Sequence, residues 1–336
     1  MAIGPIGIAA NPASGKDVRR LVARASVFDN QEKCAIIRRA VVGAMAASAR
    51  EFRFLPDTHG ITEAALEEFA TELHFEPVDS PATGSALDTT RAARGLKEAG
   101  CAVVITLGGD GTNRAFALGW HDAPLVPVST GTNNVFPRFV EATIAGAAAG
   151  LIATGAVALE EVAKPTKVIC VEIEDEKDDL ALIDAVLTRQ RFVGSRALLD
   201  ADQLQLALLT RAEPSAVGVT AIGGLIQPVS EDADHGLLLK MGEGGDIVYA
   251  PIAPGLYQDV SVRSVAAVSP GERIEIRGPG VLAFDGERER ILKPGQKAWL
   301  RLERNGPRVV DTQRTLELAA CRGVFRRKST GETDAH

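Results

Sequence analysis

One stretch, Ala102–Thr112, constrains the fold of this chain more than any other. It reads AVVITLGGDGT, so an apolar run ends at Leu107 and three glycines with one aspartate follow directly. A short apolar run closed by glycines is typical of a buried parallel strand that ends in a tight loop. Residues 113–120 then have a helical pattern. The stretch therefore predicts a strand, a glycine loop and a helix, and open α/β sheets bind ligands at such junctions.

The residue types in this loop suggest phosphate chemistry. Gly108, Gly109 and Gly111 would let the backbone approach a polyanion closely. Thr112 and the free N–H groups of the helix start would face the same anion. Asp110 would repel phosphate unless it holds a metal ion or takes a proton from an acceptor hydroxyl, so it is both the candidate catalytic residue and the candidate metal ligand. The alternative is a glycine-rich turn in which Asp110 only caps the helix.

Two further loops follow predicted strands in the same way. Asn11 and Ser14 come directly after the apolar residues 3–10, in the string NPASGK. The other loop follows residues 125–129, and its donors suit phosphate, ribose or a base: Thr130, Gly131, Thr132 and Asn133. Since each loop follows a strand, we expect all three to line one nucleotide crevice. Taken alone, the first loop would be better explained as a helix start that Ser14 caps.

Strand-like and helical patterns alternate up to about residue 155. The expected strands are residues 3–10, 51–55, 75–78, 102–107 and 125–129. The expected helices are residues 17–25, 31–49, 61–73, 86–99, 113–120 and 142–157. This alternation predicts an α/β nucleotide-binding domain with a doubly wound parallel sheet over residues 1–155.

Beyond residue 155 the pattern changes to short strands between Gly and Pro turns. These strands are residues 167–174, 205–210, 247–250, 259–268, 272–276, 281–284 and 297–301. We therefore predict a second, mostly antiparallel and sandwich-like β domain over residues 156–305. The acidic residues 174–179 are expected to form a solvated turn. Residues 311–321 have a helical pattern, and residues 326–336 are expected to be a frayed tail.

Composition narrows the range of partners. The 336 residues have a net charge of −7 and only 4% aromatic residues, which disfavours nucleic acid as a partner. We see no signal peptide and no apolar stretch of membrane-spanning length, so we expect a cytoplasmic protein without a membrane partner. Four cysteines are widely spaced and form no CxxC pair, which favours buried thiols over disulfides or zinc: Cys34, Cys101, Cys170 and Cys321.

Several motifs together resemble one superfamily. GGDGT resembles the signature that NAD kinases, diacylglycerol kinases and sphingosine kinases share. The NPxSG opening resembles the lipid-kinase branch and the acetoin catabolism protein X family, and the latter is the branch that the chain resembles most. Three later strings follow in the same order as in these families, namely Thr220–Pro228 with Gly223 and Gly224, Pro251–Pro254, and Phe284–Glu287.

The resemblance implies a fold and a set of ligands. It implies an N-terminal α/β domain, a β-rich domain for the acceptor, and a C-terminal segment, residues 306–336, that returns to the first domain. The implied phosphoryl donor is ATP or polyphosphate with Mg²⁺, and NAD is a candidate substrate.

The resemblance also implies roles for single residues. Asp184, Gly223 and Gly224 would contact the nucleotide, although NAD kinases carry an Asn where this chain has Ile183. Lipid kinases place their base on the hairpin that resembles DGE, so Asp285 and Glu287 are rivals of Asp110 as catalytic residues.

Three functions remain open on this basis. The first is an ATP-dependent kinase that phosphorylates a hydroxyl of NAD or of a related small molecule, with a link to acetoin catabolism. The second is a nucleotide-binding regulator that has lost catalysis. The third is a lipid kinase of the diacylglycerol-kinase type. We also expect a homo-oligomer, a dimer or tetramer, that forms through the β domain.

Overall fold

The N-terminal part of the chain is built on a seven-stranded sheet. The computed structural model describes residues 3–14, 29–81, 83–131, 134–189, 201–286 and 288–326. The sheet has the order β3-β2-β1-β4-β5-β17-β6. Its strands are β1 (Ile6–Ala10), β2 (Glu51–Phe54), β3 (His74–Pro77), β4 (Val103–Gly108), β5 (Pro124–Ser129), β6 (Ala163–Pro165) and β17 (Arg308–Val310). β1 to β5 pair in parallel, β17 continues parallel to β5, and β6 pairs antiparallel with β17 at the edge.

The strand order reverses between β1 and β4. The sheet extends from β1 to β2 and β3 in one direction, and from β4 to β5 in the other. Both central strands are buried along their whole length, as their sequences IGIAA and VVITLG require for a sheet that is covered on both faces. The carboxyl ends of β1 and β4 therefore form a switch point of the topology, where open α/β sheets bind their ligands.

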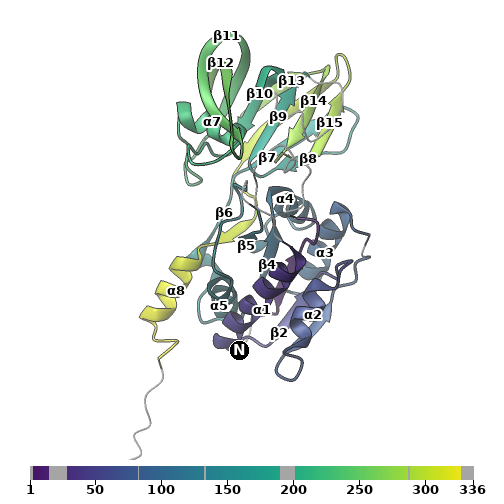
Figure 1. Cartoon of the computed structure of the whole chain (residues 1–336), viewed down its shortest axis with the longest axis vertical. Coiled ribbons are helices and arrows are strands. Elements are labelled where there is room, and N and C mark those ends of the chain that lie inside the picture. The colour runs from purple at the N-terminus through teal and green to yellow at the C-terminus, as the bar shows by residue number, and fades with distance from the viewer. Residues whose placement is uncertain are drawn as a thin grey trace, which may run out of the picture.

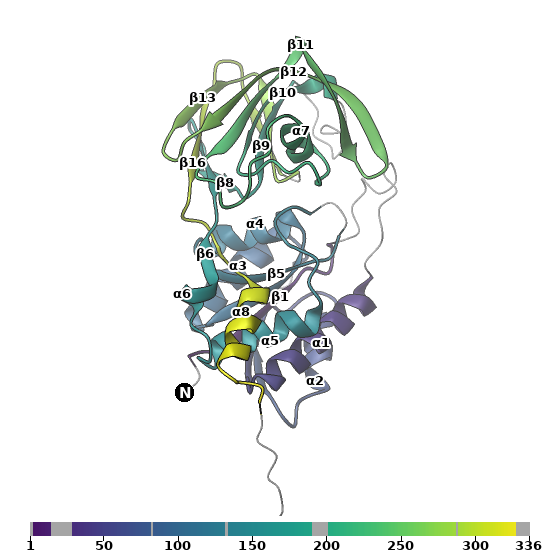
Figure 2. The same cartoon turned by 90° about the vertical axis from the view of Figure 1, so that its left-hand side faces the viewer.

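Helices cover both faces of this sheet (Figure 1). One apolar core joins the sheet to α1 (Asn30–Ala46), α2 (Ile61–Glu67) and α5 (Ala142–Ala153), and the other joins it to α3 (Ala86–Glu98) and α4 (Asp110–Gly119). The backbones of α1 and α5 approach very closely, because a Cβ on Gly146 would lie 1.7 Å from the carbonyl oxygen of Ala40. After the short α6 (Leu159–Val162), the chain leaves this sheet through β6, and the C-terminal α8 (Thr312–Cys321) packs on α5 (Figure 2).

The second half is a pair of antiparallel sheets stacked above the first sheet in Figure 1. The six-stranded sheet contains β12 (Leu256–Val268), β11 (Gly236–Ala253), β10 (Leu204–Leu209), β9 (Asp184–Thr188), β14 (Gly280–Phe284) and β15 (Arg288–Leu292). The four-stranded sheet contains β13 (Arg273–Arg277), β16 (Lys297–Glu303), β7 (Val168–Ile173) and β8 (Asp179–Ala181). Apolar side chains such as Leu282 and Leu300 fill the space between the sheets, and α7 (Val219–Ile226) covers the outer face of the larger sheet.

The predicted fold class is confirmed: a parallel sheet with helices on both faces precedes a β-rich, sandwich-like part, and α8 packs back on the first part. The expectation of a solvated turn over residues 174–179 is wrong at its end, because Asp179 is buried in β8. The helix expected over residues 61–73 ends at Glu67. The helix expected over residues 17–25 and the tail after residue 326 lie outside the described residues. No helix in the described part is long and apolar enough to cross a membrane.

Candidate functional site

Three loops meet at the carboxyl ends of β1, β4 and β5, on the side of the sheet that faces the second half of the molecule (Figure 1). The Nδ2 of Asn11 donates to the hydroxyl of Thr112 at 2.9 Å. The hydroxyls of Ser14 and Thr130 lie 2.9 Å apart. The backbone N–H of Thr130 donates to the carbonyl of Gly108. The loop residues that the sequence singled out are thus neighbours in space, although they come from three separate strands.

The glycine loop is shorter than the sequence suggested. β4 runs through Gly108 and α4 begins at Asp110, so Gly109 alone separates the strand from the helix. A Cβ on Gly108 would lie 2.4 Å from the Cβ of Thr112. A Cβ on Gly109 would lie 2.7 Å from Oδ1 of Asn134. Close packing against these two side chains therefore requires both glycines. The first N–H groups of α4, like those of any helix, have no partner inside the helix.

Asp110 is the first residue of α4, and its carboxylate joins the glycine loop to the loop after β5. The carboxylate oxygens accept the backbone N–H of Phe136 at 2.8 Å and that of Val135 at 3.1 Å. Removal from water raises the pKa of Asp110 to about 7, and the charge of Asp285 adds to the rise. The two N–H groups and the charge of Arg211 oppose it. A carboxyl that titrates near neutrality is well suited to accept and return a proton.

Asp285 is buried at the turn between β14 and β15, where its φ of +49° lies in the left-handed region. Its carboxylate accepts the backbone N–H groups of Leu182, Ile183 and Asp184 at 2.8–3.1 Å. Burial raises the pKa of Asp285, while the Arg114 guanidinium and these three N–H groups act to lower it. The carboxylate therefore fixes the backbone of residues 182–184. It thereby also fixes the position of Asp184, the first residue of β9.

Arg114 on α4 projects from the first domain into the second and is almost fully buried. Its guanidinium donates to the carboxylate of Asp179 and to the carbonyl of Leu180, and it lies 5.1 Å from the centre of the Phe284 ring. Arg290 contacts the other oxygen of Asp179 at 3.2 Å. The sequence patterns assigned no role to Arg114. Its role as an anchor between the domains has no local signal, because Asp179 and Leu180 are 65 and 66 residues away.

Lys33 is a second residue that the sequence patterns did not reveal. It is fully buried on α1, and its ammonium group donates to the carbonyls of Asn11, Pro12 and Ser14 at 2.6–3.1 Å. These bonds fix the backbone of the first loop from behind. A signal was available, since Lys33 lies on the same helical face as the apolar residues Ile36 and Ile37 and a lysine there needs buried acceptors.

Gly223 and Gly224 lie in the middle of α7, away from the ends of the helix. A Cβ on Gly224 would lie 2.3 Å from the carbonyl carbon of Glu213, and one on Gly223 would lie 2.6 Å from the side chain of Leu209. Close helix packing explains why both are glycines. Their contact with a nucleotide stays a prediction.

Three predicted site residues lie outside the described residues, namely Thr132, Asn133 and Glu287. The described residues contain no group of three or more His, Cys, Asp or Glu side chains that would hold a metal ion by themselves. Asp110 is a single carboxylate beside the glycine loop. This donor set fits Mg²⁺ shared with substrate phosphates, because Mg²⁺ commonly takes one or two carboxylates and completes its shell with phosphates and water.

Comparison with known proteins bears on both halves of the chain. Residues 6–157 match the ATP-NAD kinase N-terminal domain, and residues 167–305 match the acetoin catabolism protein X C-terminal domain. The chain is 34% identical over 331 residues to the acetoin catabolism protein X of Cupriavidus necator, a match that covers 94% of this chain and 90% of that protein. Yeast NADH kinase in complex with NADH has a similar fold, with a TM-score of 0.53 at 14% identity over 100% of this chain and 90% of that one. The resemblance that the motifs indicated is thereby confirmed.

Proposed function

Because this chain belongs to the acetoin catabolism protein X family, with a kinase-like N-terminal domain, we propose that it is an ATP-dependent kinase that phosphorylates a hydroxyl of NAD or of a related small molecule. The observation that carries the proposal is the junction around Asp110. Three loops converge at the switch point of the sheet, and a carboxyl with a pKa of about 7 lies among them. The name of the relative suggests a role in acetoin catabolism.

The donor half of the proposal rests on the glycine loop. The N-terminus of α4 offers its first N–H groups to the phosphates of ATP or polyphosphate. Asn11, Ser14 and Thr130 add polar groups around the same space, and Lys33 keeps the first of these loops rigid. Mg²⁺ bound to the phosphates would neutralise charge on the transferred group, and a direct bond from Asp110 to Mg²⁺ would be the alternative to the role of this carboxylate as the base.

In the acceptor half, Asp110 takes the proton of the acceptor hydroxyl. Its carboxylate cannot swing freely, because Val135 and Phe136 hold it, and a fixed base needs little reorganisation. Asp285, which holds residues 182–184, lies near enough to Asp110 for its charge to raise the pKa of Asp110. We propose that Asp184 contacts a ribose hydroxyl of the acceptor. Ile183 stands where NAD kinases carry an amide, so the acceptor is a molecule that binds without a hydrogen bond to that amide.

The direct test is a transfer assay on the full chain. ATP labelled at the γ-phosphate, or polyphosphate, is offered with Mg²⁺ and one acceptor at a time: NAD, NADH, or a panel of small polyols. Label in an acceptor supports the kinase, and the acceptor that is labelled identifies the substrate. Thermal shift with ATP, NAD, NADP and NADH runs in parallel. Binding without transfer to any acceptor contradicts the kinase and supports a regulator.

The regulator is the second candidate, and one observation favours it. Both oxygens of Asp110 already accept backbone N–H groups, so a purely structural role for this carboxylate is physically reasonable. The lipid-kinase alternative depends on Glu287, outside the described residues. Transfer of label to diacylglycerol in mixed micelles, abolished by Glu287→Gln, would identify that activity.

Gly109→Val is expected to weaken ATP binding by about tenfold or more, the equivalent of losing one charge-assisted hydrogen bond. The new side chain would meet Asn134 and project where the phosphates are proposed to lie. Isothermal titration with ATP measures the effect, and Ala64→Val on the exposed face of α2 is the control. ATP affinity equal to the wild type in folded Gly109→Val would place the donor site elsewhere.

A homo-oligomer through the β domain also remains a proposal. The hairpin of β11 and β12 exposes Ile247, Tyr249 and Tyr257, and the two tyrosine rings lie 5.1 Å apart. We propose that a second copy covers this patch. Light scattering after size exclusion should show a dimer or tetramer that Tyr249→Lys with Tyr257→Lys shifts to a smaller species. A wild-type monomer at micromolar concentration would contradict the proposal.

A further inference from the structure

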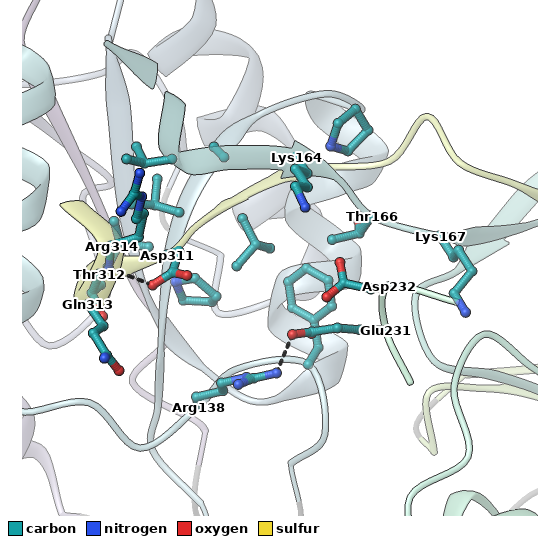
Figure 3. Close-up of a pocket in the computed structure, with 18 of the residues that line it drawn as sticks. Arg138, Lys164, Thr166, Lys167, Glu231, Asp232, Asp311, Thr312, Gln313 and Arg314 are labelled. Atoms are coloured by element: carbon teal, nitrogen blue, oxygen red, sulfur yellow. Dashed lines mark hydrogen bonds and ion pairs between the residues drawn. The ribbon is translucent and has the colours of Figure 1, made fainter. Parts of the chain in front are cut away.

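A cavity of about 580 Å³ lies where the chain passes between the two domains (Figure 3). We call it the linker cavity. Its wall includes Thr166 and Lys167, which connect β6 to β7, and Arg304, which begins the return from β16 to β17. Its apolar side is formed by residues of the first sheet and the segment after it, such as Val126 and Phe136. A ligand in this cavity would therefore contact both domains.

Cations are buried at one side of the linker cavity. Lys167 is 3% exposed and Arg211 is 4% exposed, and Arg304 lies close enough that both arginines lower the pKa of Lys167. Burial is the larger cause, and the pKa of Lys167 falls to about 8. Like charges held together away from water are costly unless anions balance them.

Donors in this cluster remain unused. The ammonium of Lys167 donates to the carbonyls of Ser230 and His235, which leaves one of its three N–H groups without an acceptor among the described residues. The Nε of Arg211 is buried and meets no hydrogen-bond partner within the part of the chain that the structure describes. Lys164 extends its ammonium group into the opening (Figure 3) and forms no ion pair in the described part of the chain.

The acidic residues of the lining are mostly engaged elsewhere. Glu231 pairs with Arg138, as the dashed line in Figure 3 shows, and with Arg211 at 2.9 Å. Asp311 accepts the backbone N–H of Arg314 and caps α8. Glu160 and Glu161 pair with arginines outside the lining, Arg308 and Arg322. Asp232 and Asp311 form no ion pair in the described part of the chain, and Arg211 also contacts Glu213 at 3.8 Å. Six Lys or Arg side chains and five Asp or Glu side chains line the cavity, so the formal charge of its described lining is +1.

We propose that the linker cavity binds a small organic anion, whose charged oxygens Lys164, Lys167 and Arg211 receive. Its apolar body lies against Val126 and Phe136. The anionic group is a carboxylate or a phosphate ester, since guanidinium and ammonium groups bind both. The site lies next to the GGDGT junction without being part of it. Phe136 connects the two sites, because its backbone N–H donates to Asp110 while Phe136 also lines the cavity.

The test uses three probes with the same ring: benzoate, phenyl phosphate and the neutral benzyl alcohol. Isothermal titration of the full chain should show binding of at least one anion, about tenfold or more tighter than that of benzyl alcohol. The anion that binds better identifies the carboxylate or the phosphate ester as the preferred group. Binding of neither anion, or equal binding of the alcohol, would overturn the proposal.

Variants locate the bound probe. Arg211→Met and Lys164→Met should each lower the affinity for the anionic probe by about tenfold. Arg91→Met, which replaces an exposed arginine on α3, should leave this affinity unchanged. Lys164 is exposed and makes no ion pair among the described residues, so its variant serves even if Arg211→Met does not fold. Wild-type affinity in both Lys164→Met and Arg211→Met would contradict the linker cavity as the site.

Discussion

Asp110→Asn is expected to lower turnover by about 10²–10⁴-fold, the range that a positioned general base contributes. An amide cannot take the proton of the acceptor hydroxyl. An amide oxygen in the place of Oδ1 can still accept the N–H groups of both Val135 and Phe136, so the loop junction should largely survive. The measurement is kcat with ATP and the labelled acceptor, with the Kd of ATP and the thermal midpoint as checks on binding and folding.

The same carboxyl should make activity and stability depend on pH in opposite directions. As a base it works when deprotonated, so turnover should rise with pH through about 7. Its pKa in the folded chain is about 7 and its ordinary value is 3.8, so between these values the folded state keeps a proton that the unfolded state has lost. The free energy of unfolding should therefore fall as pH rises through this window, by at most about 1.4 kcal/mol per pH unit. Asp110→Asn should remove both dependences.

Two outcomes would count against Asp110 as the base. A small loss of turnover in Asp110→Asn together with a large loss in Glu287→Gln would favour a base on the hairpin, as in the lipid-kinase branch. If turnover of Asp110→Asn still rises with pH through about 7, the group that titrates there is not Asp110. Glu287→Asp, which keeps the charge, is the matched control for the hairpin.

Arg114→Met is expected to destabilise the protein by about 3–5 kcal/mol, because it leaves the carboxylate of Asp179 buried without its closest cation. Arg290 contacts Asp179 from the partly exposed side and should compensate only in part. Chemical denaturation measures the change. Arg91→Met removes an exposed arginine whose contact with Asp88 is 4.0 Å, and it should cost less than about 1 kcal/mol.

A double variant separates the ion pair from the packing around it. Replacement of a buried ion pair by apolar residues is often close to neutral, so Arg114→Met with Asp179→Leu should recover much of the loss. If the double variant is as unstable as the sum of the two single ones, the Arg114–Asp179 pair does not hold the domains together. A change of less than about 1 kcal/mol in Arg114→Met would lead to the same conclusion.

The order of the motifs was enough to predict the family, and the strand and helix patterns were enough to predict the fold class. GGDGT alone fits several loops, but the strings around residues 220–228, 251–254 and 284–287 follow it in the order of the family, and the match over 331 residues agrees. Element bounds were less accurate where packing overrides pattern. The helix after the glycine loop begins three residues earlier than its apolar pattern, at Asp110, whose carboxylate accepts the N–H groups of a loop 25 residues away.

Local patterns in the chain were enough to predict that a glycine loop with one acid follows a buried parallel strand, and that two further loops follow other strands. Apolar runs, glycines and their order are local properties. What holds these loops emerged only from the folded chain: Lys33 behind the first loop, the N–H groups of Val135 and Phe136 on Asp110, and Asp179 on Arg114. Each of these contacts joins segments that are distant in the chain. Buried polar groups must find partners wherever the fold brings donors and acceptors together, and no local pattern records that choice.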